Sequence, residues 1–457
     1  MKTIFITAFH AFISKNIFNT DVLKILKQRK DLKIILLVPK ILKDFFENNY
    51  RSDNVIIEGI DLAPFQNSRS NNFFSKMSFF FIYNHWIKRK RWDYAAQNPG
   101  IFNYLKYHIL ITATFLLSGY KTINRIFRFF SRHFSPDNFY EFYFEKYKPD
   151  LVFTPDVYDD FDQALIKEAK IRKISVVGMV RSWDNNISKG LMKCLPDRLI
   201  VNNEVIKKEA IKLHDYPEKN IFIGGLPQFD DYLKAPFKSR EEFFKTVGGD
   251  PDKKTILFSP GWREMSETNA DICQSFRTAK KNGVLPENVQ FFVRHHPTRP
   301  DVALDEKFKN DPDFIIETPG AMRGSGKFLE FSMQDNIHLI DTVYYSDVVV
   351  WIVTSIGLDS LVFDKPQIAV DFDGPKKKPY WESIKRFNDE DHMRSFFKTG
   401  GIKKAGDIDE LIFLISQYLK NPQLDKDGRK KAALQQLWKV DGRSGERIAN
   451  FILSFLF

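Results

Sequence analysis

The sequence predicts an α/β protein made of two doubly wound domains, each built on a parallel sheet. Short apolar runs alternate with segments of helical spacing along most of the 457 residues, which is the rhythm of βαβ units. The alternation is lost near residue 235 and then resumes, so a linker is expected there. A ligand is expected in a central crevice between the domains, because open parallel sheets bind ligands beyond the carboxyl ends of their strands.

The first domain is expected to span residues 1–235. Its predicted strands are "KTIFITAF", "LKIILLVP", "KPDLVFTPD", "ISVVGMV", "DRLIVNN" and "NIFIGGLP". Helical spacing is found in "SKNIFNTDVLKILKQR", in "DQALIKEAKIRK" and from about residue 204 to residue 213. Each strand run is short and has an apolar centre, and the alternation of such runs with helical segments indicates a parallel sheet.

The second domain is expected to span residues 236–435, with a further helix at 436–457. Its predicted strands are "KKTILFSP", "VQFFVRHHP", "IHLID", "DVVVWIVTS" and "PQIAVDF". The stretch "QFDDYLKAPFKSR" before them shows neither the apolar run of a buried strand nor helical spacing, and it is predicted to be the linker.

Composition narrows the class of protein. Cys194 and Cys273 lie far apart, with no CxxC partner or ligand cluster, which favours a reducing, cytoplasmic location over a disulfide framework. The stretch "MKTIFITAFHAFISKN" is predicted to be a first strand, since it lacks the apolar core and the cleavage site of a signal peptide.

A basic, aromatic insertion is expected at residues 71–134. It contains ten of the Lys and Arg residues, a single acid (Asp93) and 18 of the 68 aromatic residues, within a chain of net charge +11. The apolar run at 109–117 is too short to span a bilayer, which needs roughly 20 residues. Basic residues mixed with Trp, Phe and Leu suit a segment lying on an anionic membrane surface. The alternative is a helical insertion whose aromatic side chains face the core. A nucleic-acid partner is not expected, because no RNA-binding motif is found.

Unusual residues follow three predicted strands of the second domain. Gly261 allows close backbone approach, and arginine binds phosphate oxygens in a bidentate manner. A Thr-Ser pair precedes a helix amino terminus, which favours anions, and an aspartate one turn later could accept hydrogen bonds from ribose hydroxyls. The sequence therefore predicts a nucleotide-phosphate site, for which the expected donor-binding residues are Gly261, Arg263, Arg294, His296, Thr354, Ser355 and Asp359.

These motifs resemble the donor-binding half of the GT-B superfamily, and are most similar to the glycerophosphotransferases of teichoic acid synthesis and related surface-polysaccharide enzymes. The shared motifs are Pro-x-Trp-Arg at 260–263, Arg-x-His-Pro at 294–297, and a hydroxyl pair followed by Asp and Lys-Pro at 354–366. The first domain also resembles UDP-GlcNAc 2-epimerases, and the likeness covers roughly residues 145–375. It implies two Rossmann-like domains, nucleotide contacts at these motifs, and a carboxyl-terminal helix that packs back across the domains.

One departure from the resemblance concerns the catalytic base. The teichoic acid enzymes have a Trp-His-Gly motif, whereas this chain has "RSWDNNISKG", which places Asp184 where the histidine would stand. Asp184 is therefore expected to deprotonate the acceptor hydroxyl, with Arg181 and Trp183 on the acceptor side. His10, which follows the first strand, is the rival base, since several inverting GT-B enzymes use a histidine there.

The acids after the third predicted strand have two interpretations. Asp159, Asp160 and Asp162 could bind a metal ion, but such a run more often caps a helix amino terminus. No metal or other cofactor is expected, because GT-B enzymes generally work without a catalytic metal.

The resemblance implies a glycosyltransferase of surface polysaccharide or glycolipid synthesis. Its expected partners are a nucleotide-sugar donor, a glycan or lipid-linked acceptor and the inner membrane face. The alternatives are a CDP-alcohol phosphotransferase acting with glycerol or ribitol phosphate, a non-hydrolysing sugar-nucleotide epimerase, and a non-catalytic GT-B-like scaffold.

Overall fold

The computed structural model describes residues 1–457 except 11, 67, 135–137, 298, 324–327 and 375–376. The chain forms two compact units. Unit 1 contains 1–230, 322–330 and 441–457, and unit 2 contains 231–321 and 331–440. In the part of the chain that is described, no helix has both the length and the apolar character needed to cross a membrane.

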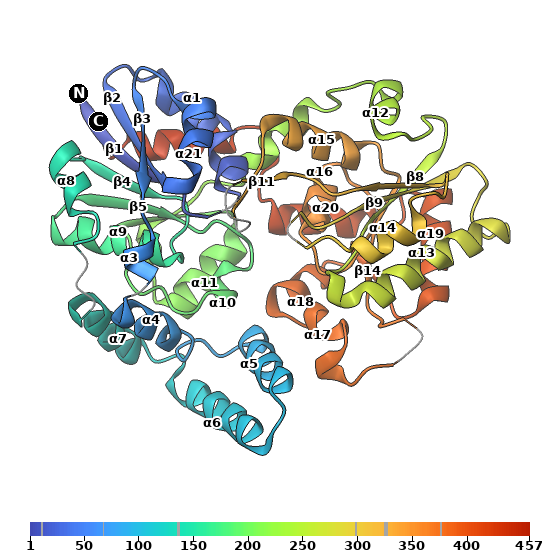
Figure 1. Ribbon diagram of the computed structural model, residues 1–457, viewed down its shortest axis with the longest axis horizontal. Helices are drawn as coiled ribbons and strands as arrows, with labels where there is room; N and C mark the ends of the chain where they lie inside the picture. Colours follow the sequence, from blue (N-terminus) through green and yellow to red (C-terminus); the bar gives the residue numbers. More distant parts are fainter. Residues whose placement is uncertain (11, 67, 135–137, 298, 324–327, 375–376) are drawn as a thin grey trace. The chain divides into compact units, whose positions relative to one another are not determined.

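Unit 1 is built on a seven-stranded sheet in the order β3-β2-β1-β4-β5-β6-β7 (Figure 1), and all neighbouring strands are parallel. Side chains of β1 alternate between two cores, because Ile4 and Ile6 pack on one face of the sheet and Phe5 packs on the other. The strands are β1 (Lys2–Thr7), β2 (Leu32–Pro39), β3 (Val55–Ile60), β4 (Leu151–Thr154), β5 (Ser175–Met179), β6 (Arg198–Val201) and β7 (Ile221–Ile223).

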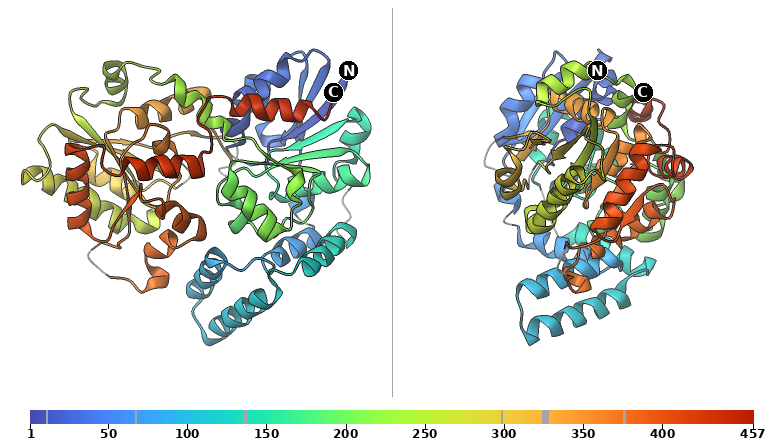
Figure 2. Two further views of the ribbon diagram at one scale, coloured as in Figure 1. Left: turned by 180° about the vertical axis from the view of Figure 1, so that it is seen from behind. Right: turned by 90° about the vertical axis from the view of Figure 1, so that its right-hand side faces the viewer.

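Helices cover both faces of this sheet. The core with Ile4 includes α1 and also α21, whose Ile448 and Ile452 are fully buried. The termini of the chain consequently lie near each other in unit 1 (Figures 1 and 2). The helices are α1 (Asp21–Gln28), α2 (Lys43–Tyr50), α3 (Ala63–Gln66), α8 (Glu141–Tyr147), α9 (Asp160–Ile171), α10 (Asn185–Ser188), α11 (Glu204–His214) and α21 (Ser444–Leu453).

The basic, aromatic segment is helical. It forms α4 (Arg69–Ser78), α5 (His85–Gln97), α6 (Ile101–Leu117) and α7 (Lys121–Phe134). Helices α4 and α7 lie side by side in all views (Figures 1 and 2). They meet in a separate cluster of buried side chains that contains Phe74 of α4, Phe127 of α7, Phe81 from the loop after α4, and Leu191.

Unit 2 is built on a six-stranded parallel sheet in the order β10-β9-β8-β13-β14-β15. One face of the sheet packs on α13 through Ile272 and Phe276 and on α19 through Leu411 and Ile415. The strands are β8 (Lys254–Ser259), β9 (Val289–Arg294), β10 (Phe314–Glu317), β13 (Val348–Trp351), β14 (Gln367–Val370) and β15 (Lys403–Ala405). The helices are α12 (Arg240–Val247), α13 (Ser266–Lys281), α14 (Val302–Phe308), α15 (Met333–Tyr344), α16 (Ile356–Val362), α17 (Lys385–Asn388), α18 (Asp391–Phe397), α19 (Ile408–Lys420) and α20 (Lys426–Gln436).

Short elements complete the chain. The strands β11 (Ala321–Arg323) and β12 (Phe328–Glu330) pair with each other. The single-turn or irregular helices are η1 (Ser14–Phe18), η2 (Lys40–Leu42), η3 (Glu218–Asn220), η4 (Pro227–Lys234), η5 (Arg263–Met265) and η6 (Tyr380–Glu382).

The run "IHLID" was expected to be a strand and is instead part of α15, so this prediction is wrong. The helix starts at a capping box, in which Ser332 Oγ accepts a hydrogen bond from the Asp335 amide and the Asp335 carboxylate accepts one from the Ser332 amide. Such a box fixes a helix start, and a five-residue run with three apolar positions does not by itself distinguish a strand from a buried helix.

Candidate functional site

Three neighbouring strands of unit 2 carry the predicted donor-binding residues. β9, β8 and β13 are adjacent and parallel, so their carboxyl ends lie along one edge of the sheet. The loop of Gly261 follows β8, Arg294 ends β9, and Thr354 follows β13. The structure therefore brings these predicted residues to a common edge.

The loop after β8 is held from α13. The Gly261 amide donates to Asn269 Oδ1 at 3.0 Å, and Asn269 Nδ2 donates to the Gly261 carbonyl at 3.0 Å and to Asp301 Oδ2 at 2.9 Å. A Cβ atom at Gly261 would lie 2.5 Å from Met265 Sδ, so a larger residue does not fit without a shift. Two residues further on, the side chain of Arg263 is 77% exposed, and its Nε lies 3.7 Å from Glu264 Oε1 in a surface ion pair.

Arg294 is buried at the end of β9 in a three-residue cluster. Its guanidinium forms an ion pair with Glu317 at the end of β10, and His338 Nε2 donates to Glu317 Oε2 at 2.5 Å. Burial lowers the pKa of Arg294 to about 10, so the side chain remains cationic at neutral pH. Burial, followed by the charge of Arg294, lowers the pKa of His338 to about 4, so this imidazole is neutral and can donate through Nε2.

The two adjacent histidines after β9 have different surroundings. Buried His295 is held at both ring nitrogens, by Asp305 at 2.6 Å from Nε2 and by the Asp301 amide at 3.4 Å from Nδ1. His296 is half-buried, and burial, together with Arg299, lowers its pKa. The arrangement assigns a structural role to His295 and leaves His296 as the histidine of the predicted donor site.

The residues after β13 are placed by a tight loop and by α16. Ser355 is exposed and precedes α16, and Thr354 Oγ1 is 3.5 Å from the Ile356 amide. Asp359 is buried within α16, where its carboxylate accepts a hydrogen bond from the hydroxyl of the buried Tyr232. A contact of Asp359 with ribose remains a prediction.

The predicted residues of unit 1 also collect at strand ends. β1, β4 and β5 are adjacent and parallel, and they are followed by His10, Asp156 and Arg181. Arg181 Nε donates to Asp156 Oδ2 at 2.9 Å, and Arg181 Nη2 lies 3.3 Å from His10 Nε2. Since a guanidinium only donates, His10 Nε2 accepts in this contact. Burial raises the pKa of Asp156, but the charge of Arg181, together with hydrogen bonds from Arg181 and the Tyr158 amide, outweighs it and leaves the pKa below its ordinary value.

Asp184 is held by hydroxyl groups. Ser182 Oγ donates to Asp184 Oδ1 at 2.7 Å, and Ser188 Oγ donates to Asp184 Oδ2 at 3.1 Å. The residue precedes α10 and is partly exposed, as is Trp183 beside it. Hydroxyl donors orient a carboxylate and leave lone pairs for a further proton.

The three acids near β4 have separate partners. Asp159 caps α9 by accepting from the Phe161 amide at 2.9 Å, Asp160 pairs with Lys193, and Asp162 accepts from the Thr7 hydroxyl. Burial, then the charge of Asp156, raises the pKa of Asp159 to about 7. No group of three or more His, Cys, Asp or Glu side chains suited to a metal ion is found among the residues whose placement is described.

Sequence reasoning missed several residues that position this site. Glu317 ends a strand and could have been found by the strand-end rule that located Arg294, had "FIIE" been recognised as β10. His338 lies in the helix that was predicted as a strand. Asn269 lies inside α13, eight residues after Gly261, and no local pattern indicates its contact with that loop.

Comparisons with known proteins agree with this architecture. Residues 185–454 match the family described as CDP-Glycerol:Poly(glycerophosphate) glycerophosphotransferase. The S. aureus MnaA–UDP co-structure is similar over 100% of this chain and 97% of that chain, with 11% identity and a TM-score of 0.56. UDP-GlcNAc 2-epimerase from Neisseria meningitidis bound to UDP-GlcNAc is similar over 99% of this chain and 100% of that chain, with 12% identity and a TM-score of 0.54.

A third solved structure is the wall teichoic acid polymerase TagF, similar over 100% of this chain and 88% of that chain, with 10% identity and a TM-score of 0.52. At these identities the likeness shows the fold alone, and it confirms the expected GT-B class with two Rossmann-like domains. A comparison with curated protein sequences found no match.

Proposed function

The chain belongs to the CDP-glycerol:poly(glycerophosphate) glycerophosphotransferase family, which makes it a transferase of cell-wall polymer synthesis that uses a nucleotide-activated donor, and we propose that the group it transfers is a sugar. The acceptor hydroxyl attacks the anomeric carbon of the sugar, the bond from that carbon to the phosphate oxygen breaks, and the nucleoside diphosphate leaves. The proton of the hydroxyl passes to Asp184. The alternative base is His10.

Unit 2 supplies the donor site in this proposal. Arg263 is exposed and Arg294 is fixed by Glu317 at neighbouring strand ends. Cationic groups placed where negative charge develops on the leaving phosphate lower the barrier. We propose that Arg263 and Arg294 neutralise this charge without a metal ion, and that His296, Thr354 and Ser355 contribute hydrogen bonds beside them.

The carboxylate of Asp184 is the observation that carries the choice of a sugar. It lies in the position that resembles the histidine of the teichoic acid enzymes, and the hydroxyl groups of Ser182 and Ser188 hold it. In glycosyl transfer the reacting carbon becomes oxocarbenium-like and positive, which a nearby carboxylate stabilises. In phosphoryl transfer the reacting group is itself anionic, so a carboxylate there can take the acceptor proton but does not stabilise the developing charge.

Transfer of glycerol phosphate is the second candidate, favoured by the family match itself. In that reaction the acceptor oxygen attacks the phosphorus atom that carries glycerol. The bond from this phosphorus to the bridging oxygen breaks, and CMP leaves instead of a nucleoside diphosphate. The two candidates therefore differ in the nucleotide that they release.

A donor screen tests the proposed function. The purified protein is incubated with CDP-glycerol and with the common UDP-, GDP- and dTDP-linked sugars, with a polymer or glycolipid acceptor extract, and released nucleotides are resolved by anion-exchange chromatography. Acceptor-dependent release of a nucleoside diphosphate from a nucleotide sugar supports sugar transfer. Release of CMP from CDP-glycerol, with none from any nucleotide sugar, contradicts it and assigns the second candidate.

We also propose that the protein works on the cytoplasmic face of the membrane. The support is α6, whose Ile101, Phe102, Leu105 and Ile109 side chains are each more than half exposed beside Lys106. Other aromatic side chains of the same segment, such as Phe74, do face a core. Flotation with anionic vesicles, lost in neutral vesicles or at high salt, is the expected result. A protein that stays with the soluble fraction under all conditions would contradict it.

A further inference from the structure

Arg299 is a second exposed arginine at the donor edge of unit 2. It lies in the turn after β9, where its amide donates to the His296 carbonyl at 3.1 Å. Its guanidinium lies over the ring of Trp262, 5.2 Å from the ring centroid, and Trp262 belongs to the loop that follows β8. Because β8 and β9 are adjacent and parallel, the two loops meet at one edge of the sheet, and this stacked pair joins them.

Trp262 is itself held in place. Its ring packs edge to face against the ring of the buried Phe387 of α17, with the centroids 5.6 Å apart. A cation over an aromatic face is attracted by about 0.5–1 kcal/mol at an exposed site. Stacking uses the face of the guanidinium and leaves the N–H groups along its edge available to donate. A side chain that is oriented in advance in this way loses less freedom when it binds a ligand.

Arg299 differs from the two other arginines of this edge in its pairing. Arg294 forms an ion pair with Glu317, and Arg263 forms one with Glu264. Among the residues whose placement is described, no carboxylate pairs with the guanidinium of Arg299. Arg299 therefore keeps its full charge for a ligand.

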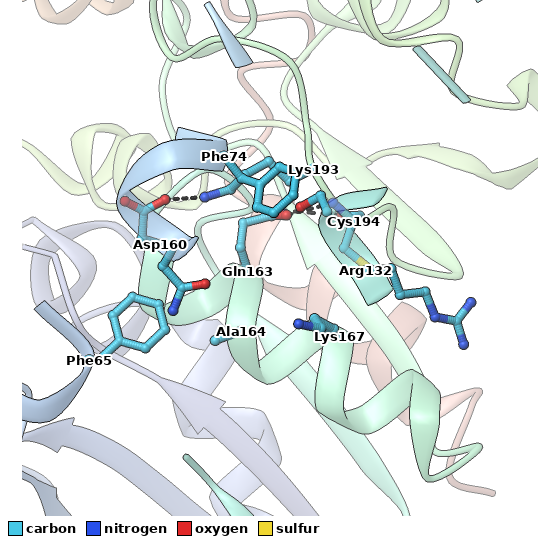
Figure 3. A pocket seen from close by; sticks show the side chains of 11 residues that line it. Phe65, Phe74, Arg132, Asp160, Gln163, Ala164, Lys167, Lys193 and Cys194 are labelled. Atoms are coloured by element: carbon cyan, nitrogen blue, oxygen red, sulfur yellow. Dashed lines mark hydrogen bonds and ion pairs between the residues drawn. The ribbon is translucent and has the colours of Figure 1, made fainter. Parts of the chain in front are cut away.

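The cationic cluster of unit 1 offers no comparable site. Its members Arg132, Lys167 and Lys193 surround a pocket of about 20 Å³, which has room for about one water molecule. Figure 3 shows Lys193 directed at Asp160, with which it forms an ion pair. A phosphate group does not fit in this pocket, whereas the donor edge presents Arg299 at the surface.

We propose that Arg299 binds the distal phosphate of the donor, which is the phosphate that carries the transferred sugar, and that Trp262 positions it. The inference rests on the proposed function, in which the bond from the anomeric carbon to this phosphate breaks and its electron pair stays on the phosphate oxygen. The distal phosphate gains negative charge in that step. A cation without a carboxylate partner stabilises the new charge more than a cation that is already paired. Arg299 would thus make the site specific for donors with two phosphates.

Calorimetric titration of the full-length protein with a nucleoside diphosphate and with its own monophosphate tests the inference. The pair is that of the tightest binder among UDP, CDP, GDP and dTDP. Arg299→Gln should weaken binding of the diphosphate about tenfold, the lower limit for a hydrogen bond to a charged group, and change binding of the monophosphate by less than about twofold. The matched control is Lys307→Gln, because Lys307 is an exposed cation of α14 that lies over the Phe308 ring at 5.6 Å. This control should bind both nucleotides as the parent does.

Trp262→Leu separates positioning from packing. Leucine keeps an apolar side chain against Phe387 and removes the aromatic face beneath Arg299, so the preference for the diphosphate should fall about twofold to fivefold. Adding this change to Arg299→Gln should cause no further loss, because two residues that act through one contact are not additive. A further loss in the double variant, or an equal loss of monophosphate binding in Trp262→Leu, would show that Trp262 supports the fold alone.

Three results would overturn the role of Arg299. Equal weakening of both nucleotides in Arg299→Gln would place it at the phosphate that they share, and an equal loss in Lys307→Gln would indicate a general effect of charge. Unchanged diphosphate binding in Arg299→Gln, with a raised KM for the acceptor, would assign Arg299 to the acceptor.

The donor screen gives a separate answer about the proposed function. Release of CMP from CDP-glycerol alone contradicts sugar transfer, whether or not Arg299→Gln loses its preference for the diphosphate. Release of a nucleoside diphosphate from a nucleotide sugar, with parent-like binding of that diphosphate by Arg299→Gln, contradicts only the role of Arg299. If none of the four diphosphates binds the parent protein, both are wrong.

Discussion

Replacing Arg294 by glutamine tests whether this buried side chain serves the donor as well as the fold. The Arg294 side chain is 6% exposed and that of Glu317 is 19% exposed, so loss of the cation leaves a mostly buried carboxylate without its ion-pair partner. Breaking a buried pair in this way costs about 3–5 kcal/mol of the free energy of unfolding. Because Glu317 is partly exposed, we expect a loss near the lower end of this range. A loss of about 3 kcal/mol lowers the Tm of a domain the size of unit 2 by about 6–12 °C.

Glu317→Gln is the matched variant, because it removes the same ion pair and keeps the cation. The amide oxygen of the new side chain can still accept from His338. If Arg294 binds a donor phosphate, Arg294→Gln should weaken nucleotide binding by about tenfold to a hundredfold, since a hydrogen bond to a charged group contributes about 1.5–3 kcal/mol. Glu317→Gln should bind the nucleotide as tightly as the parent or more tightly, because its Arg294 no longer shares its charge with a carboxylate.

Both quantities are measured on the same preparations, with urea unfolding for stability and calorimetric titration of the responsive nucleoside diphosphate for affinity. The reasoning is refuted if the two variants lose nucleotide affinity equally and in proportion to their loss of stability. Arg294 would then act on the fold alone.

Three further predictions concern proton transfer, pH and metal. Asp184→Asn should slow transfer by about 10²–10⁴-fold and leave donor affinity unchanged in steady-state kinetics. If instead Asp184→Asn keeps its transfer activity and His10→Gln loses it, the base is His10. Burial, then Asp156, raises the pKa of Asp159 from 3.8 to about 7, so the folded state holds this proton more tightly than the unfolded chain and stability falls as pH rises through that range. Urea unfolding of Asp159→Asn should therefore depend less on pH between those values, with the exposed Asp44→Asn of α2 as the control that keeps the slope of the parent; identical slopes in all three proteins would contradict this. Transfer should be unchanged by EDTA, and a loss that Mg²⁺ restores would contradict metal-independent chemistry.

The sequence predicted the sheets well because parallel strands covered on both faces are continuous apolar runs. β2 and β9 are fully recognisable in this way, and the strand-end rule then placed Arg294 and the Gly261 loop at one edge. The recognition of strands as apolar runs failed for "IHLID", because five residues are too few to show whether the period is that of a strand or of a helix. The start of this helix depends on a capping box at Ser332.

Contacts between distant segments were beyond the reach of sequence patterns. The composition of residues 71–134 indicated a basic, aromatic insertion, but the packing of Phe74 on Leu191 depends on tertiary structure. In the same way Arg181 could be placed after its strand, while its contacts with Asp156 and His10 depend on the neighbouring positions of β1, β4 and β5 in the sheet. Local spacing predicts which residues reach an edge, and the strand order decides which of them meet.

The position of α21 has a consequence for the order in which the protein matures on the ribosome. The fully buried Ile448 and Ile452 belong to the same core as Ile4, yet they are translated after every residue of unit 2. Domains usually fold in the order of synthesis, but here unit 2 emerges whole while the first sheet still lacks one of its covering helices. The core around Ile4 is thus completed only after unit 2 has been translated, and a chaperone that shields the bare face of β1 and β2 would have to remain bound until then.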